Sequence, residues 1–260
     1  MKIGVCRGLD DFEGMKAAAG YVDYWEIGFG ALADYDDEKF ELCKKTLAEN
    51  GIECIAANCF IPGKFKLTGE NVDYSGVCEY LDKGFERAKK LGIKKVVFGS
   101  GGARSFPEDF SKEKAEEQLA CFLKELVAPK AKKAGCVVVT EPLRFCESNI
   151  IHMVSDAVKL ARKVDDSNIA SLADLYHVYG NDDDLEGIAS FKNEVRHAHI
   201  AEPVNRRYPS ENDSDEAKNM YKNFFSALEK AGCDTCSIEG RTDDFENDIK
   251  TATAFLRGIL

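Results

Sequence analysis

The strongest constraint on the fold is an alternation of short apolar, β-branched runs with longer amphipathic segments along the whole chain. Runs that are apolar throughout are typical of strands in a parallel sheet, because both faces of such a sheet are buried. The expected strands lie at residues 3–6, 24–27, 52–56, 95–98, 136–140, 169–172, 195–200 and 235–238. Helical periodicity is found between them at residues 37–49, 77–91, 112–134, 154–163, 216–231 and 245–256.

Eight strand–helix units in 260 residues predict an α/β fold, the (β/α)8 TIM barrel, with a single domain over residues 1–260. The alternative is a doubly wound open sheet, which a glycine-rich phosphate loop after the first strand would favour. The turn at that place reads RGLDD at residues 7–11 and lacks the glycine pattern. No linker or low-complexity stretch marks a domain boundary.

Charge and hydropathy limit the partners of the protein. The 35 basic and 46 acidic side chains give a net charge of −11, whereas a general nucleic-acid binder needs a basic face. The amino terminus lacks the apolar core of a signal peptide, and no stretch reaches the roughly 18 apolar residues of a membrane span. We therefore expect a cytoplasmic protein with no nucleic-acid partner and no membrane partner.

Acidic and imidazole side chains stand at the ends of four consecutive expected strands. Glu141 ends the fifth strand, Asp174 follows the sixth, His199 lies in the seventh and Glu239 ends the eighth. In a barrel these ends meet at one face, where active sites lie. Three carboxylates and one imidazole suit Mn²⁺, Co²⁺ or Mg²⁺, with Zn²⁺ as a further candidate. The expected cofactor is therefore one divalent metal ion.

Each of these side chains also has a structural interpretation. A lone glutamate at a strand end commonly pairs with a lysine, Asp174 fits a helix N-cap, and a lone histidine is often a hydrogen-bonded core residue. The metal hypothesis depends on the four occurring together on consecutive strands. Two further polar side chains are placed near them: Glu26 ends the second strand, and His197 shares a face with His199, where it either supports the site or packs.

Five motifs, in this order and at wide spacing, resemble the xylose-isomerase-like TIM barrel superfamily. The closest branch is the sugar phosphate isomerase/epimerase group, which includes ketose 3-epimerases of the D-tagatose 3-epimerase type. The resemblance extends over most of the chain. The motifs are VTEPL at residues 139–143, DLYH at 174–177, HAH at 197–199, Asn205-Arg206, and SIEGR at 237–241.

The resemblance assigns roles to individual residues. It implies that Glu141, Asp174, His199 and Glu239 ligate the metal, and that Glu141 and Glu239 also move protons on opposite sides of the substrate carbon. It implies that His177 and Arg206 contact substrate oxygens, with the adjacent Arg207 as an alternative to Arg206. The remaining candidate substrate-binding residues are Glu147, from the strand-five motif, and Trp25, which either lines the sugar face or packs at the barrel rim.

The chain departs from the family motif in two loops. The family run Glu-Pro-Leu-Asn-Arg-aromatic-Glu reads EPLRFCE at residues 141–147, so the asparagine is missing and one residue is inserted before Glu147. The loop from His199 to Arg206 is one residue longer. Because both loops would contact substrate, these changes bear on the substrate more than on the metal.

The expected function is that of a metal-dependent isomerase or epimerase of a sugar or sugar phosphate. One glutamate would remove a proton next to the ketose carbonyl, the metal would stabilise the bound enediolate, and the other glutamate would return a proton. The alternatives are a dehydratase or lyase of a cyclic polyol ketone, an apurinic endonuclease-like enzyme and a non-catalytic sugar-binding barrel. Homo-oligomers are common among such barrels, and the sequence leaves the oligomeric state open.

Overall fold

The computed structural model describes residues 1–260 as a closed barrel of eight parallel strands in chain order. Each strand pairs with the next, and β8 pairs with β1 to close the barrel. The predicted TIM barrel and all eight of its strands are confirmed. The strands are β1 (Lys2–Cys6), β2 (Tyr24–Gly28), β3 (Glu53–Asn58), β4 (Lys95–Phe98), β5 (Val137–Thr140), β6 (Ile169–Asp174), β7 (Val195–Ile200) and β8 (Thr235–Ile238).

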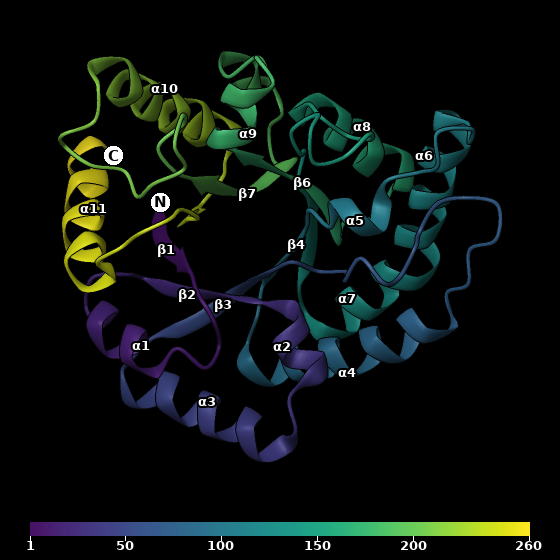
Figure 1. The fold of residues 1–260 in the computed structure, drawn as a ribbon, viewed down its shortest axis with the longest axis horizontal. Coiled ribbons are helices and arrows are strands. Elements are labelled where there is room, and N and C mark those ends of the chain that lie inside the picture. The colour runs from purple at the N-terminus through teal and green to yellow at the C-terminus, as the bar shows by residue number, and fades with distance from the viewer.

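Helices form a layer around the barrel, with α3 and α10 on opposite sides of it in Figure 1. The predicted helical segments are all present, as α3 (Asp37–Glu49), α4 (Ser75–Leu91), α6 (Lys112–Cys121) with α7 (Ala128–Ala134), α8 (Val154–Val164), α10 (Asp215–Ala231) and α11 (Phe245–Ile259). The sequence pattern does not predict the short helices α1 (Phe12–Ala18), α2 (Phe29–Asp34), α5 (Gly101–Arg104) and α9 (Leu175–Gly180), nor the 3₁₀ helix η2 (Glu186–Ser190). None of the helices combines the length and the apolar character that crossing a bilayer requires.

The single helix predicted over residues 112–134 is interrupted by a wider turn. Residues Phe122–Val127 form the π-helical segment η1 between α6 and α7. Pro129 follows two residues later and has no N–H to donate to the carbonyl four residues before it. The missing donor gives a physical reason for the change of hydrogen-bond pattern at this point.

Three helices end at a glycine, and this glycine determines where the following strand begins. Gly92, Gly135 and Gly232 lie directly after α4, α7 and α10, and each has a φ near 80°. Glycine adopts this left-handed conformation without steric cost, so the chain reverses within a few residues. Strands β4, β5 and β8 therefore begin two or three residues after these glycines, at fixed positions relative to their helices.

Side chains alternate between the inside of the barrel and the helix layer. Glu26 contacts His197 although β2 and β7 are not neighbouring strands, so this contact crosses the barrel interior. The adjacent Trp25 consequently points outward, where its ring packs edge-on against Phe245 at the start of α11. The interior also holds a small apolar cluster of Val97, Val139, Ala170 and Leu172.

Candidate metal centre

The structure brings the four expected metal ligands together at the carboxyl ends of β5 to β8. One ligand atom from each of Glu141, Asp174, His199 and Glu239 lies within 4.8 Å of the others. Nδ1 of His199 is 3.1 Å from Oε1 of Glu141 and 3.3 Å from Oε2 of Glu239. Carboxylates in such a cluster repel one another, and a bound cation would compensate that repulsion. These four residues are called the metal cluster below.

The surroundings of the Asp174 carboxylate indicate whether the four residues fit a cation. Oδ1 of Asp174 accepts the N–H of Tyr176, whereas Oδ2 is buried and has no hydrogen-bond partner. A buried carboxylate oxygen without a partner is costly, and a metal ion would supply what it lacks. The set of three carboxylates and one imidazole therefore fits a divalent cation with a preference for oxygen ligands.

Glu26 lies behind the imidazole of His199. Its Oε1 is 3.0 Å from Nε2 of His199, while Nδ1 of the same ring faces the metal cluster. A carboxylate that accepts the N–H of a metal-binding histidine fixes the tautomer and the orientation of the ring. The sequence places Glu26 at a strand end without indicating its role, and the signal for that role is an acidic residue on the inward face of the strand.

A hydrogen-bonded network continues from Glu26 into the barrel. Oε2 of Glu26 is 3.0 Å from Nε2 of His197 and accepts a 2.5 Å hydrogen bond from Ser237. Nδ1 of His197 lies 2.8 Å from the Thr235 hydroxyl, and the Tyr24 hydroxyl lies 2.8 Å from that of Ser237. His197 thus touches Glu26 and supports the metal cluster through that residue.

The environment distinguishes three glutamates, of which Glu26 and Glu141 are buried and Glu239 is partly exposed. Burial alone would raise the pKa of Glu26, but His199 and His197 outweigh it and hold that pKa well below its ordinary value. Burial also opposes ionisation of Glu239, yet His199 and Arg206 lower its pKa to about 2. For Glu141 burial dominates and the pKa is raised. Two carboxyl groups of one cluster therefore have pKa values shifted in opposite directions.

His177 and Arg206, the expected substrate contacts, lie against the metal cluster. Nη2 of Arg206 donates a 2.6 Å hydrogen bond to Oε2 of Glu239 and lies 3.7 Å from Oδ2 of Asp174. Nε2 of His177 is 3.3 Å from the same Asp174 oxygen, and its Nδ1 is buried without a partner. Both side chains are in place to hold oxygen atoms of a ligand at the cluster.

Trp25 and Glu147 are not brought to the metal cluster. Trp25 is completely buried, and its Nε1 donates to the carbonyl of Gly8 on the outer side of the barrel. Glu147 is exposed, and its carboxylate forms no ion pair with a residue of the cluster. Their expected substrate contacts therefore remain without support from the geometry.

Arg104 holds the segment that carries Glu141. Its side chain is fully buried and donates hydrogen bonds to the carbonyls of Phe98, Glu141 and Ile151. Burial lowers the pKa of this guanidinium to about 10, well above neutral pH. A permanent cation with three carbonyl partners fixes the end of β5 relative to the loops beside it.

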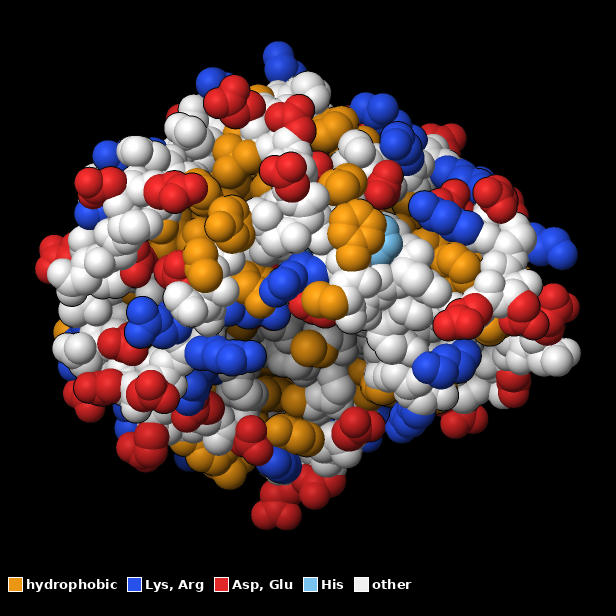
Figure 2. All heavy atoms as spheres, turned by 45° about the horizontal axis from the view of Figure 1, so that its top comes forward, with side chains coloured by type: hydrophobic (Ala, Val, Ile, Leu, Met, Phe, Trp, Pro, Cys, Tyr) orange, Lys and Arg blue, Asp and Glu red, His pale blue; other side chains and the backbone are white.

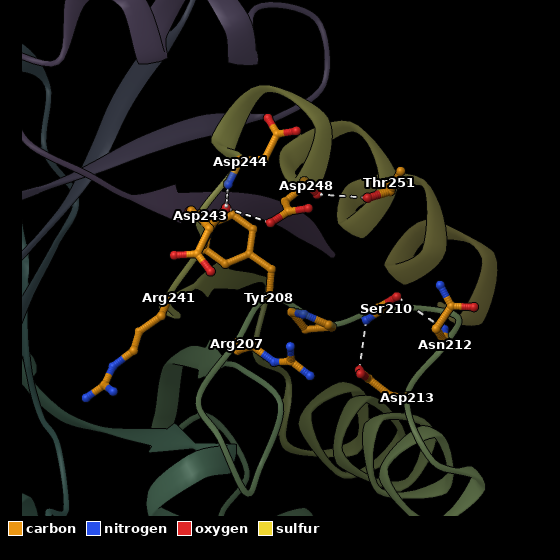
Figure 3. A pocket seen from close by; sticks show the side chains of 12 residues that line it. Arg207, Tyr208, Ser210, Asn212, Asp213, Arg241, Asp243, Asp244, Asp248 and Thr251 are labelled. Carbon is orange, nitrogen blue, oxygen red and sulfur yellow. Dashed lines mark hydrogen bonds between the residues drawn. The ribbon is translucent and has the colours of Figure 1, made fainter.

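A polar pocket of about 450 Å³ lies next to the metal centre, between the segments that follow β7 and β8 (Figure 3). Arg207, the alternative to Arg206, lines this pocket, and its backbone pairs with that of Arg241. Figure 3 shows the side chains of Arg207 and Arg241 extending in different directions. No residue of the metal cluster lines the pocket. Arg207 therefore faces this pocket, whereas Arg206 contacts the metal cluster.

The fold and the site define a parallel (β/α)8 barrel with an oxygen-rich candidate metal centre at the carboxyl ends of its strands. The model of the family described as xylose isomerase-like TIM barrel matches residues 16–259. The chain therefore belongs to the xylose isomerase-like TIM barrel family. No curated protein matches its sequence.

Solved structures share this fold over nearly their whole length. D-psicose 3-epimerase with D-tagatose from Clostridium cellulolyticum H10 is 18% identical, with a TM-score of 0.85 over 100% of this chain and 99% of that chain. The 3-keto-D-glucoside 4-epimerase from E. coli is 20% identical, with a TM-score of 0.79 over 99% of both chains. AP endonuclease, family 2, from Brucella melitensis is 20% identical, with a TM-score of 0.76 over 96% of this chain and 97% of that chain. At these identities the likeness establishes the fold.

Proposed function

We propose that the protein is a divalent-metal-dependent isomerase that epimerises or isomerises a ketose or ketose phosphate by moving a proton next to the carbonyl. The observation that carries this proposal is the convergence of two carboxylates from different strands, Glu141 and Glu239, on Nδ1 of His199 in one cluster. A site that only bound a sugar would have no need of two carboxylates that can each move a proton.

The two glutamates divide the proton transfer. They reach the substrate from β5 and β8, so one removes a proton from the carbon next to the carbonyl and the other returns a proton. Return to the opposite face of the same carbon gives epimerisation, whereas return to the neighbouring carbon gives aldose–ketose isomerisation. A divalent cation at the metal cluster would polarise the carbonyl and stabilise the negative charge that develops on its oxygen.

His177 and Arg206 orient the substrate in this proposal. Nε2 of His177 lies 3.3 Å from Oδ2 of Asp174 and 3.9 Å from Oε1 of Glu141, so this ring faces the metal cluster at which a substrate hydroxyl would bind. The Arg206 guanidinium touches Glu239 and lies close to Asp174, so it can hold an oxygen and balance developing negative charge. Both residues match positions that the family resemblance assigns to substrate contacts.

The comparisons support an epimerase more than the other family activities. D-psicose 3-epimerase, L-ribulose 3-epimerase and 3-keto-D-glucoside 4-epimerase are named for epimerisation of keto sugars, and all three share the fold. An AP endonuclease shares it too. On the face shown in Figure 2, basic and acidic side chains are interspersed, whereas a DNA-binding surface gathers basic ones.

The decisive experiment is solvent-deuterium incorporation into ketoses and ketose phosphates with Mn²⁺, Co²⁺ or Mg²⁺ supplied. Exchange at the carbon next to the carbonyl is expected for a true substrate, and NMR of the products separates epimers, isomers and dehydrated products. Glu239→Gln should abolish exchange, whereas Glu246→Gln, an exposed change on α11, should not. Full exchange by Glu239→Gln would contradict the assigned role, and incision of abasic DNA would favour the endonuclease alternative.

A further inference from the structure

Arg144 is a cation beside the metal centre that has no carboxylate partner. It lies three residues after Glu141, in the loop between β5 and α8. Its one side-chain hydrogen bond is donated by Nη1 to the hydroxyl of Tyr176, and it forms no ion pair. Acidic side chains outnumber basic ones by 46 to 35 in this chain, so a half-buried guanidinium without a counterion is a site prepared for an anion.

Two neighbours hold this guanidinium in a defined place. Its Cζ lies 4.9 Å from the centre of the Tyr176 ring, a cation–π contact. A Cβ atom added at Gly180 would lie 2.8 Å from Nε and 3.0 Å from Cδ of Arg144. The side chain can therefore lie along α9 because position 180 has no side chain. An ordered guanidinium loses less conformational entropy when it binds a ligand.

Tyr176 connects Arg144 to the metal centre. Cζ of Arg206 lies 4.8 Å from the centre of the same ring, and Arg206 donates to Glu239. The backbone N–H of Tyr176 donates a 2.9 Å hydrogen bond to Asp174. Arg144 thus contacts the same aromatic ring as the arginine that touches the metal cluster, within the reach of a sugar chain bound at that cluster.

We propose that Arg144 binds an anionic group, a carboxylate or a phosphate, that the substrate carries away from its reacting carbonyl. This inference rests on the proposed isomerase function and names the substrate class of that same site. Arg206 is already paired with Glu239 and lies near Asp174, whereas Arg144 has no carboxylate partner and can hold a second substrate group. The planar fork of a guanidinium matches the oxygens of either anion.

The test compares neutral ketoses, keto sugar acids and ketose phosphates with the wild-type protein, Arg144→Gln and a control. The control is Arg162→Gln, which removes an exposed guanidinium paired with Glu194. The wild type should turn over one anionic class with the highest kcat/KM. Arg144→Gln should lower that kcat/KM by about 10- to 100-fold, chiefly through KM, and leave neutral ketoses within about twofold. The favoured class identifies the anion as carboxylate or phosphate.

A second measurement does not depend on turnover. Binding of inorganic phosphate to the metal-free protein, followed by calorimetry, should weaken at least about tenfold in Arg144→Gln and stay unchanged in Arg162→Gln. Equal phosphate affinity in the three proteins would overturn the inference. So would a wild type that prefers neutral ketoses, or an Arg144→Gln variant that loses the same kcat on every substrate, since Arg144 would then only support Tyr176.

The outcomes separate this inference from the proposed function. Deuterium incorporation only into neutral ketoses would contradict the inference of an anionic substrate and still support the isomerase function. No incorporation into any ketose, with phosphate binding that depends on Arg144, would contradict the isomerase function and leave an anion site at Arg144.

Discussion

The carboxylate of Glu26 on β2 and Nε2 of His199 on β7 lie 3.0 Å apart across the inside of the barrel. The contact is on the side of the imidazole opposite to the metal cluster, which Nδ1 faces. Since the hydrogen bond determines which ring nitrogen carries the proton, it leaves the Nδ1 lone pair free to bind a cation.

Glu26→Gln should weaken Mn²⁺ binding by roughly 10- to 100-fold, because an amide orients the His199 ring less firmly than a carboxylate. Calorimetric titration of the metal-free protein measures the change. The matched control is Glu53→Gln at the start of β3, where the carboxylate is exposed and pairs with Lys2. Unchanged Mn²⁺ affinity in Glu26→Gln would mean that the metal, if bound, does not depend on the orientation of His199.

Metal loading should raise the melting temperature of the protein. A ligand that binds only the folded state at about 100 times its Kd adds roughly 2.7 kcal/mol to the free energy of unfolding. Asp174→Asn should remove most of this Mn²⁺-dependent gain, because Asp174 contributes a buried oxygen that accepts no hydrogen bond. Asp215→Asn, exposed on α10, should keep it. Thermal unfolding followed by circular dichroism measures the Mn²⁺-dependent rise in melting temperature. An equal rise in both variants would exclude Asp174 as a ligand.

Arg104→Met should lower the free energy of unfolding by about 3 kcal/mol, because three carbonyls lose a buried charged donor. The control is Arg257→Met, in which the lost guanidinium is 45% exposed and pairs with Asp23. Its cost should be below about 1 kcal/mol. Chemical denaturation measures both, and equal costs would show that the buried contacts of Arg104 add no stability.

Gly4→Ala should destabilise the barrel, whereas Gly28→Ala should be close to neutral. A Cβ at Gly4 would lie 2.2 Å from the Tyr24 ring inside the barrel, while a Cβ at Gly28 meets nothing within 4 Å. Overpacking of this kind costs roughly 1–3 kcal/mol, and the neutral change should stay within about 0.5 kcal/mol. Denaturant titration of the two variants checks this, and a stable Gly4→Ala protein would mean that the Tyr24 ring can move aside.

The convergence of four side chains could be predicted from the sequence, because this step needs no knowledge of side-chain contacts. Glu141, Asp174, His199 and Glu239 each stand at the carboxyl end of a strand, and barrel closure alone brings those ends to one face. The short helices α1, α2, α5 and α9 are missed for a physical reason. Each has only four to seven residues, too few to show an amphipathic repeat.

The hydrogen-bonded network inside the barrel and the outward position of Trp25 could be established only from the structure. Glu26 and His197 are 171 residues apart on strands that are not neighbours, so no local pattern connects them. For Trp25 a usable signal was present: side chains alternate along a strand, and an inward Glu26 sends Trp25 to the outside. The roles of Glu26, Arg144 and Tyr176 depend on contacts between segments far apart in the chain, which spacing along the sequence does not encode.

The network beneath His199 begins with Thr235, the first residue of β8, at the amino-terminal end of the barrel strands. Thr235 contacts His197, His197 contacts Glu26, and Glu26 in turn contacts His199. Substitutions at that remote end can thus change how firmly the imidazole is aimed without altering any residue that a ligand touches.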